Sequence, residues 1–323
     1  MPSYERINYL LRPNKSVERK MVCDILSRIS TIKNLTEYQY IGFGSTYFAD
    51  FSLFHRELGI SQMISIEGVA KAKKRCEFNK PFACIELKMG DSSTVLPNLD
   101  INKKDSIIWL DYDGGIADYI FSDINTVITT MRPGSFFMLS INSELYKKDL
   151  SDEEIRQEIV NNIGEDRFPK IFADVRMNNK TYQELLYRCL ADEIKNVVQN
   201  RQGLGEAELT FHQAVYFVYK DGARMMTIGG FLFKKEEEVQ YLSKLSLAQF
   251  PFYRNDNQPF NIQCPVLSLK EIQALNTYLP CEIVEENGKM TNKSLEDFPV
   301  ENKDIKSYSS LYRYYPNFTE TLI

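Results

Sequence analysis

The stretch YIGFGSTYFADF, residues 40 to 51, decides the fold that this chain adopts. A short apolar run ends in Gly-Phe-Gly and continues directly into an aromatic segment with helical spacing. Glycines let a ligand approach the backbone closely, and the start of a helix offers free N–H groups. The stretch therefore predicts a strand, a glycine-rich turn and a helix that together hold a nucleotide-like ligand.

The composition is that of a globular protein. With 323 residues, of which 43% are hydrophobic and 26% charged, the chain has room for one large domain or two ordinary ones. The sequence opens without a charged-then-apolar leader, and its apolar runs fall short of the roughly 20 residues that cross a bilayer. We therefore expect a cytoplasmic protein with no membrane partner. Its six cysteines and two histidines are scattered, so we expect no metal site.

Short apolar runs alternate with helical segments along the first half of the chain. Alternation of this kind is typical of a parallel sheet with helices on both faces. A later pair of β-rich runs, joined by Asp221-Gly222, predicts an antiparallel hairpin. We therefore expect an α/β, Rossmann-like, doubly wound sheet, mostly parallel, with a C-terminal antiparallel hairpin. The five predicted parallel strands cover residues 38–42, 62–67, 82–87, 106–111 and 135–141.

Helical patterns lie before and after these strands. An apolar spacing of four over residues 16–30 predicts an N-terminal helix, and Ser151 with Glu154, like Ser268 with Glu271, has the spacing of a capping box. The pattern of alternation stops near residue 235. The sequence thus predicts three parts, which are an N-terminal helical extension (1–36), a ligand-binding domain (37–234) and a small C-terminal helical subdomain (235–323).

Carboxylates follow successive predicted strands at the point where each strand ends. Glu67 closes the second strand, Asp91 follows the third and Asp111 the fourth, while the first ends in the glycine-rich turn. Ligands of open α/β sheets bind at the carboxyl ends of the strands. Neighbouring carboxylates without partners cost free energy. A shared ligand therefore explains this arrangement more simply than packing does.

The glycine-rich turn and Glu67 would also suit an NAD-dependent oxidoreductase, which is one alternative. An acidic residue about 20 positions after the turn reaches ribose hydroxyls in such enzymes. A dinucleotide site also needs a third small residue, which lets the helix approach the pyrophosphate. Tyr47 occupies that position here. The sequence therefore favours a ligand with an adenosine but no pyrophosphate.

With these residues together, the chain resembles the class I S-adenosylmethionine-dependent methyltransferases over roughly residues 37–234. The resemblance rests on the GFGS turn, the acid after the second strand, the Gly90-Asp91 pair, the acid after the fourth strand and the closing hairpin. It implies S-adenosyl-L-methionine as the cofactor and a methyl-transfer activity. The cofactor-binding residues that it implies are Gly42, Phe43, Gly44, Ser45, Glu67, Gly90, Asp91, Ser92 and Asp111.

The candidate catalytic residues are Asp111 and Asp113. The sulfonium of the cofactor is already activated, so the protein chiefly has to align the acceptor with the methyl group. A hydroxyl or amine acceptor also loses a proton, and these two carboxylates could orient it or receive that proton. Tyr112 lies between them and is a candidate to contact the substrate. Asp113 could instead simply form a turn with Gly114.

The methyl acceptor is the open question at this stage. Arg12, Lys15 and Arg19, the basic run 71–75 and a tyrosine-rich tail favour RNA or another nucleic acid, because cations follow phosphates and aromatic rings stack on bases. The formal net charge of −5 speaks against a largely basic surface. The alternatives are a small-molecule O-methyltransferase and a non-catalytic protein that binds the cofactor and partners another subunit. Association with a second copy of the chain is a further expectation to test.

Overall fold

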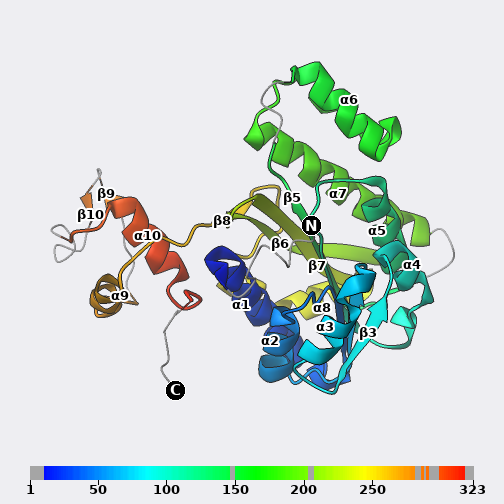
Figure 1. Ribbon diagram of the computed structural model, residues 1–323, viewed down its shortest axis with the longest axis horizontal. Helices are drawn as coiled ribbons and strands as arrows, with labels where there is room; N and C mark the ends of the chain where they lie inside the picture. The colour runs from blue at the N-terminus through cyan, green and yellow to red at the C-terminus, as the bar shows by residue number, and fades with distance from the viewer. Residues whose placement is uncertain are drawn as a thin grey trace.

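The computed structural model describes residues 11–145, 150–202, 207–280, 285–286, 289–290 and 298–316. One mixed sheet of eight strands forms the centre of the molecule (Figure 1). Strands β1 to β5 run parallel, β7 is antiparallel to β5 and β6, and β8 is parallel to β6. This arrangement confirms the predicted fold class. The spatial order is β3 (Ile85–Met89), β2 (Met63–Glu67), β1 (Gln39–Gly42), β4 (Ser106–Asp111), β5 (Phe136–Asn142), β7 (Arg224–Lys234), β6 (Leu209–Lys220) and β8 (Phe260–Ile262).

Helices cover both faces of this sheet because its central strands are apolar on both sides. Alternate residues of a strand face opposite sides, so Ile107 and Trp109 join one core while Ile108 and Leu110 join the other. The first core includes residues of α1 (Pro13–Ser27), α2 (Ala49–Leu58), α3 (Lys73–Asn79) and α8 (Lys235–Leu245). The second includes residues of α4 (Ser92–Val95), α5 (Asp118–Thr130), α6 (Asp152–Ile163) and α7 (Asn179–Gln202).

A smaller cluster forms beyond the sheet from the C-terminal helices. It is built around Leu275, Ile305 and Tyr308, and contains α9 (Leu269–Asn276) and α10 (Asn302–Leu311), which lie beyond α1 in Figure 1. The Tyr314 hydroxyl donates a hydrogen bond to Asp24 Oδ2 of α1 (2.7 Å) and so ties this cluster to the body. A two-stranded ribbon consists of β9 (Glu285–Glu286) and β10 (Lys289–Met290).

Short 3-10 helices connect many of these elements. The 3-10 helices are η3 (Arg28–Thr31), η4 (Leu35–Glu37), η5 (Ala70–Ala72), η6 (Leu96–Asn98), η7 (Ile101–Lys103), η8 (Glu165–Arg167), η9 (Lys170–Phe172) and η10 (Leu247–Gln249).

Among the described helices, none combines the length and the apolar character that crossing a membrane requires.

Both predicted capping boxes are present. Ser151 Oγ accepts a hydrogen bond from the Glu154 N–H (3.2 Å) at the start of α6, and Ser268 Oγ accepts one from the Glu271 N–H (3.3 Å) at the start of α9. In each box the glutamate carboxylate in turn accepts from the backbone N–H of the serine. Side chains thus satisfy N–H groups that a helix start leaves without partners.

Two element boundaries differ from those expected. The third strand begins at Ile85 and not at residue 82, because residues 80–84 form a turn before the pairing with β2 starts. The helix after the glycine-rich turn begins only at Ala49. Ser45 and Phe48 both have positive φ angles (52° and 49°), a conformation that no helix contains. The compact turn expected from sequence is therefore a longer loop, residues 43–48.

The segments on either side of the expected ligand-binding domain contribute to the sheet and its cores. In the expected N-terminal extension (1–36), α1 buries Val17, Met21 and Ile25 in the first core of the sheet. Beyond the expected boundary at residue 234, β8 adds a strand to the sheet and α8 packs on its face. The sheet and its covering layers thus include residues well before 37 and well after 234.

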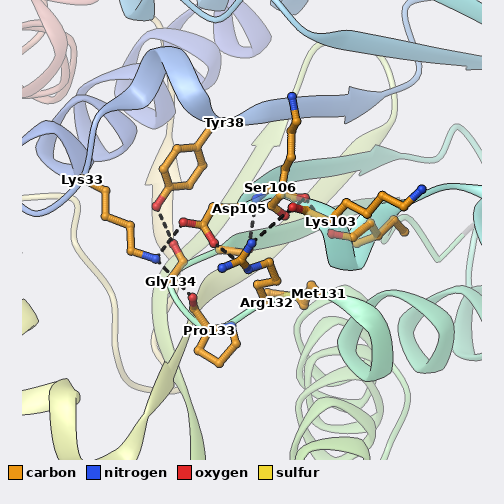
Figure 2. A network of polar contacts seen from close by, with 12 residues as sticks. Lys33, Tyr38, Lys103, Asp105, Ser106, Met131, Arg132, Pro133 and Gly134 are labelled. Carbon is orange, nitrogen blue, oxygen red and sulfur yellow. Dashed lines mark hydrogen bonds and ion pairs between the residues drawn. The ribbon is translucent and has the colours of Figure 1, made fainter.

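The amino end of β4 carries a polar network, shown in Figure 2. Asp105, the residue before β4, accepts a hydrogen bond from Lys33 Nζ (2.7 Å) and lies 3.4 Å from Arg132 Nε. The Tyr38 hydroxyl donates to the Gly134 carbonyl (2.9 Å). These contacts tie the segments before β1, β4 and β5 together at the end of the sheet opposite to the carboxyl ends of the strands.

Candidate active site

A cavity of about 560 Å³ opens at the carboxyl ends of the parallel strands. The segments that follow β1, β2, β3 and β4 all contribute to its walls, and α1 and α2 close one side. The loop after a strand is the place where an open α/β sheet presents ligand-binding groups. Four stretches that are far apart in the sequence thus meet around one space, as the pattern of strand-end acids predicted.

The loop after β1 packs closely at its second glycine. A Cβ atom at Gly44 would lie 2.6 Å from both the Phe48 ring and Ser65 Oγ, so no larger residue fits without a shift. The Gly44 N–H also donates a hydrogen bond to Ser65 Oγ (3.1 Å). The loop is thereby fixed against β2. Ser45 and Tyr47, which follow, line the cavity.

Glu67 stands at the end of β2 and is nearly buried. Its Oε1 accepts a hydrogen bond from the Val69 N–H (2.8 Å), which fixes the orientation of the carboxylate. Burial raises the pKa of Glu67, the Val69 hydrogen bond opposes that effect, and the charge of Asp113 adds to it. A carboxylate in this position can accept hydrogen bonds from the hydroxyls of a bound ligand.

Asp91 and Ser92 line the cavity after β3 and lie next to a buried carboxylate of α5. Asp123 is fully buried and accepts hydrogen bonds from the hydroxyls of Ser92 and Tyr112, the latter at 2.6 Å. Burial raises the pKa of Asp123, while these two hydrogen bonds lower it. The Tyr112 ring packs edge-on against Phe43 and Tyr119. These aromatic side chains form an apolar wall of the cavity beside its polar floor.

Asp111 forms an ion pair with a lysine of α1. Lys15 is fully buried, and its Nζ donates to Asp111 Oδ1 (2.7 Å) and lies 2.8 Å from Glu18 Oε2. Its ammonium also lies 4.4 Å from the centre of the Trp109 ring. Burial would raise the pKa of Asp111, but Lys15, with smaller contributions from two nearby arginines, outweighs it and lowers the pKa. Asp111 therefore faces the cavity as a charged carboxylate.

Arg19 and Asp50 complete this side of the cavity. Both line it, Arg19 from α1 and Asp50 from the first turn of α2. Asp50 Oδ2 accepts a hydrogen bond from the Tyr40 hydroxyl. Burial raises the pKa of Asp50, and the charge of Arg19 acts against this. Positive and negative groups thus face the same corner of the cavity.

Most of the residues predicted for the site do lie together. Tyr112 and Arg19, predicted to contact the substrate, are among the lining residues, and Asp113 stands exposed at the rim. The predicted residues that line the cavity are Arg19, Phe43, Gly44, Ser45, Glu67, Gly90, Asp91, Ser92, Asp111, Tyr112 and Asp113.

Three predicted residues do not line the cavity. Gly42 packs internally, since a Cβ there would lie 2.6 Å from the Tyr40 hydroxyl oxygen. Lys15 was expected to contact substrate phosphates, which is wrong because it is buried in an ion pair beneath Asp111. Arg12 does not line the cavity either, and its Nε lies 3.9 Å from Asp221 Oδ2. Lys15 and Arg12 therefore pair with carboxylates of the fold.

Sequence reasoning missed Asp50, Asp123 and the role of α1. Asp50 and Asp123 lie within helices, where an isolated acid usually faces solvent, and no local pattern distinguishes them. The position of α1 beneath Asp111 depends on contacts between residues almost 100 positions apart. The one available signal was the density of cations in a helix that also carries an apolar stripe. Over the described residues, no group of histidine, cysteine and acidic side chains could hold a metal ion.

Comparison with known proteins places the chain in a family. Three solved structures illustrate the similarity: the O-methyltransferase from Bacillus cereus in complex with SAH (10% identity, 71% of this chain and 84% of that chain, TM-score 0.39), the cofactor-bound Rv0187 from MTB (12%, 72% and 83%, 0.36), and the plantazolicin methyltransferase BamL (14%, 62% and 66%, 0.36). No curated protein matches the sequence. The model of the family described as "Putative O-methyltransferase" matches residues 7–323.

The chain belongs to this O-methyltransferase family, and with it to the class I S-adenosylmethionine-dependent methyltransferases. The resemblance that the GFGS turn and the strand-end acids carried is thereby confirmed. The family decides against the NAD-dependent oxidoreductase that the glycine-rich turn alone had left open. The protein is an enzyme of the methyl-transfer class.

Proposed function

We propose that the protein transfers a methyl group from S-adenosylmethionine, bound in the cavity at the carboxyl ends of β1 to β4, to a hydroxyl group. The observation that carries this proposal is the meeting of the glycine loop, Glu67, Asp91 and Asp111 around that one cavity. Its volume of about 560 Å³ is in the range of ordinary small-molecule sites, roughly 300–1,000 Å³.

The residues that line the cavity fit the cofactor in one orientation, with its adenine and its methionine end at opposite sides. Glu67, oriented by the Val69 N–H, would accept hydrogen bonds from the ribose hydroxyls. Asp91 and Ser92, next along the sheet, would contact the adenine, and the apolar wall of Phe43 and Tyr112 would flank it. Asp111, held charged by Lys15, would lie toward the methionine end. The bound cofactor supplies a methyl group already activated on a sulfonium.

The two candidate catalytic carboxylates would have different roles. Asp111 accepts a hydrogen bond from Lys15, and its pKa lies below the ordinary value, so it is a weak base. A negative charge there instead attracts a cationic group of the ligand. Asp113 is exposed at the rim of the cavity. It is therefore the better candidate to orient an acceptor hydroxyl and to take its proton.

Calorimetry with S-adenosylhomocysteine tests the cofactor site. Wild-type protein should bind this product, which remains when the cofactor has given up its methyl group, and should not bind NAD. Replacement of Glu67 by Ala should weaken binding by about 1–3 kcal/mol, the contribution of hydrogen bonds to a charged acceptor. Unchanged affinity in Glu67→Ala would assign this carboxylate a purely structural part.

For the acceptor, we propose a small hydroxyl compound. The burial of Lys15 and the proximity of Arg12 to Asp221 speak against an RNA path that uses these two residues. One observation keeps RNA as the second candidate. Exposed cations follow the cavity-lining Val69 along α3, and Phe78 on the same helix is 89% exposed, as a stacking platform would be.

Transfer of labelled methyl into fractionated cell extract separates these acceptors. Label in the small-molecule pool, lost in Asp113→Asn, supports the first proposal. Label in RNA, with binding that weakens steeply as salt rises, would replace it with the second, because each neutralised phosphate releases counterions. Label in no pool, despite cofactor binding, would point to a partner subunit that this chain requires.

A further inference from the structure

Arg19 is a buried cation that forms no hydrogen bond or ion pair with the residues that the structure describes. The side chain lies in α1, about nine-tenths buried, and lines the cavity. Its Nε makes no hydrogen bond to any residue that the structure describes, and neither do the other guanidinium nitrogens within that part of the chain. The neighbouring Lys15, in contrast, has two carboxylate partners within 2.8 Å.

A guanidinium in this position is costly unless an anion reaches it. Burying a charge without a hydrogen-bonded partner is strongly unfavourable. The guanidinium group of arginine has five N–H donors and stays protonated in proteins, so it cannot avoid this cost by losing its charge. Asp50 and Asp111 lie close enough to feel the charge of Arg19, but neither makes an ion pair with it among the described contacts. Because Arg19 lines the cavity and no described residue satisfies its donors, a ligand bound in the cavity can satisfy them.

The surroundings of Arg19 indicate what kind of ligand this is. Asp111 is held charged by Lys15 on one side, and Asp50 lies on the other. A simple anion would meet Arg19 but would be repelled by these carboxylates. A group that carries both charges would satisfy all three side chains, with its carboxylate on the guanidinium and its ammonium on the acids.

We propose that Arg19 binds the carboxylate of the amino-acid end of S-adenosylmethionine, while the ammonium of that end faces Asp111 and Asp50. This inference rests on the proposed function and deepens it, because it assigns α1 to the cofactor site. The N-terminal helix is then part of the methyl-transfer machinery. Arginine suits this position because its planar fork matches a carboxylate.

The test compares two ligands by calorimetry. S-adenosylhomocysteine has the carboxylate, whereas its decarboxylated form keeps the amino group and the nucleoside but lacks the carboxylate. Wild-type protein should prefer the first by about tenfold or more, the effect of a charge-assisted hydrogen bond. Arg19→Gln should lose this preference by binding S-adenosylhomocysteine more weakly, with unchanged affinity for the decarboxylated form. Arg19→Lys should restore part of the preference.

Two controls separate this role from a structural one. Lys244→Gln removes an exposed positive charge from α8, outside the cavity, and should leave both affinities unchanged. In thermal unfolding without ligand, Arg19→Gln should be at least as stable as the wild type, because it removes an unpaired buried charge. The stabilisation that S-adenosylhomocysteine gives should fall in Arg19→Gln.

The outcomes are distinct. Equal losses for both ligands in Arg19→Gln, or no loss for either, would overturn the assignment. Unchanged S-adenosylhomocysteine binding in Arg19→Gln, together with a raised KM for the acceptor, would also overturn it. That result would indicate that Arg19 binds an acidic acceptor. Failure of the wild-type protein to bind either ligand would instead contradict the proposed function on which the inference rests.

Discussion

The buried pair of Lys15 and Asp111 links the N-terminal helix to the carboxyl end of β4. Its two charged groups lie 2.7 Å apart, and Glu18 completes the group, with a hydrogen bond from the Thr227 hydroxyl to its carboxylate. Removing one member of a buried pair leaves the other charge without compensation. Lys15 therefore stabilises the fold and the charge of Asp111 at the same time.

We expect Lys15→Met to lower the free energy of unfolding by about 3–5 kcal/mol near neutral pH. Because the folded-state pKa of Asp111 lies below its unfolded value, the pair contributes stability above that unfolded value, about 3.9. This contribution is lost as the pH falls through the lower, folded-state pKa. Urea unfolding of both proteins over a pH series measures it.

The double variant Lys15→Met/Asp111→Asn is the matched control for that experiment. It removes the charges of Lys15 and Asp111 but leaves the buried Glu18 without its lysine, so the part of the lost stability that depends on Asp111 should return. A double variant as unstable as Lys15→Met alone would show that the lysine stabilises through Glu18 or through packing against Trp109, and not through Asp111.

Glu67 should give the binding of S-adenosylhomocysteine a distinct pH dependence. Only the ionised carboxylate accepts hydrogen bonds from both ribose hydroxyls, and burial raises the pKa of Glu67 above its ordinary value. Affinity should therefore fall with decreasing pH at a midpoint above about 4.3. Calorimetry over a pH series measures this midpoint. In Glu67→Gln that step should disappear, and a step that persists would have to come from another group.

At the scale of the elements, the loop after β1 shows where sequence reasoning stops. Apolar runs and a glycine pattern predicted the strand and the turn, because both depend on local chemistry. The positive φ angles of Ser45 and Phe48 depend on tertiary packing, with the Phe48 side chain fully buried. Neither serine nor phenylalanine favours that conformation. The start of α2 at Ala49 was therefore not predictable from propensity.

Gly44→Ala tests the close packing of this loop. The added methyl group would lie 2.6 Å from Ser65 Oγ and from the Phe48 ring, so the loop must move. We expect a loss of about 1–3 kcal/mol in the free energy of unfolding and weaker binding of S-adenosylhomocysteine. Thermal unfolding and calorimetry measure the two effects. Gly222→Ala is the control outside the site: its φ of 145° in the hairpin turn makes an added side chain strained, so this variant should lower stability but leave binding of S-adenosylhomocysteine unchanged.

At the scale of the whole molecule, the sequence predicted the sheet but not its limits. The strands β1 to β5 and the hairpin could be recognised because each is a continuous apolar run between turn residues. In contrast, β8 has only three residues, and its place beside β6 comes from pairing across more than 40 positions. Likewise, α1 has an ordinary amphipathic pattern, and nothing local shows that its cations lie under the active site.

The C-terminal limit of the fold leads to the last prediction. Beyond residue 234 the first core contains Leu245, Leu247, Phe252 and Ile262, all buried. Each such side chain contributes about 1.5–3 kcal/mol on burial, and together they approach the whole stability of a domain, about 5–15 kcal/mol. A chain that ends at residue 234 should therefore not fold.

A chain that ends at residue 266 provides the comparison, because it keeps these four side chains and β8. It lacks the small cluster of α9 and α10, together with the contact of Tyr314 with Asp24, so it should fold with a lower thermal midpoint. Circular dichroism on heating compares both truncated chains with the full one. A cooperative transition in the chain that ends at 234, at the temperature of the full chain, would restore the boundary expected from sequence. It would also mean that the sheet is stable without α8 and β8.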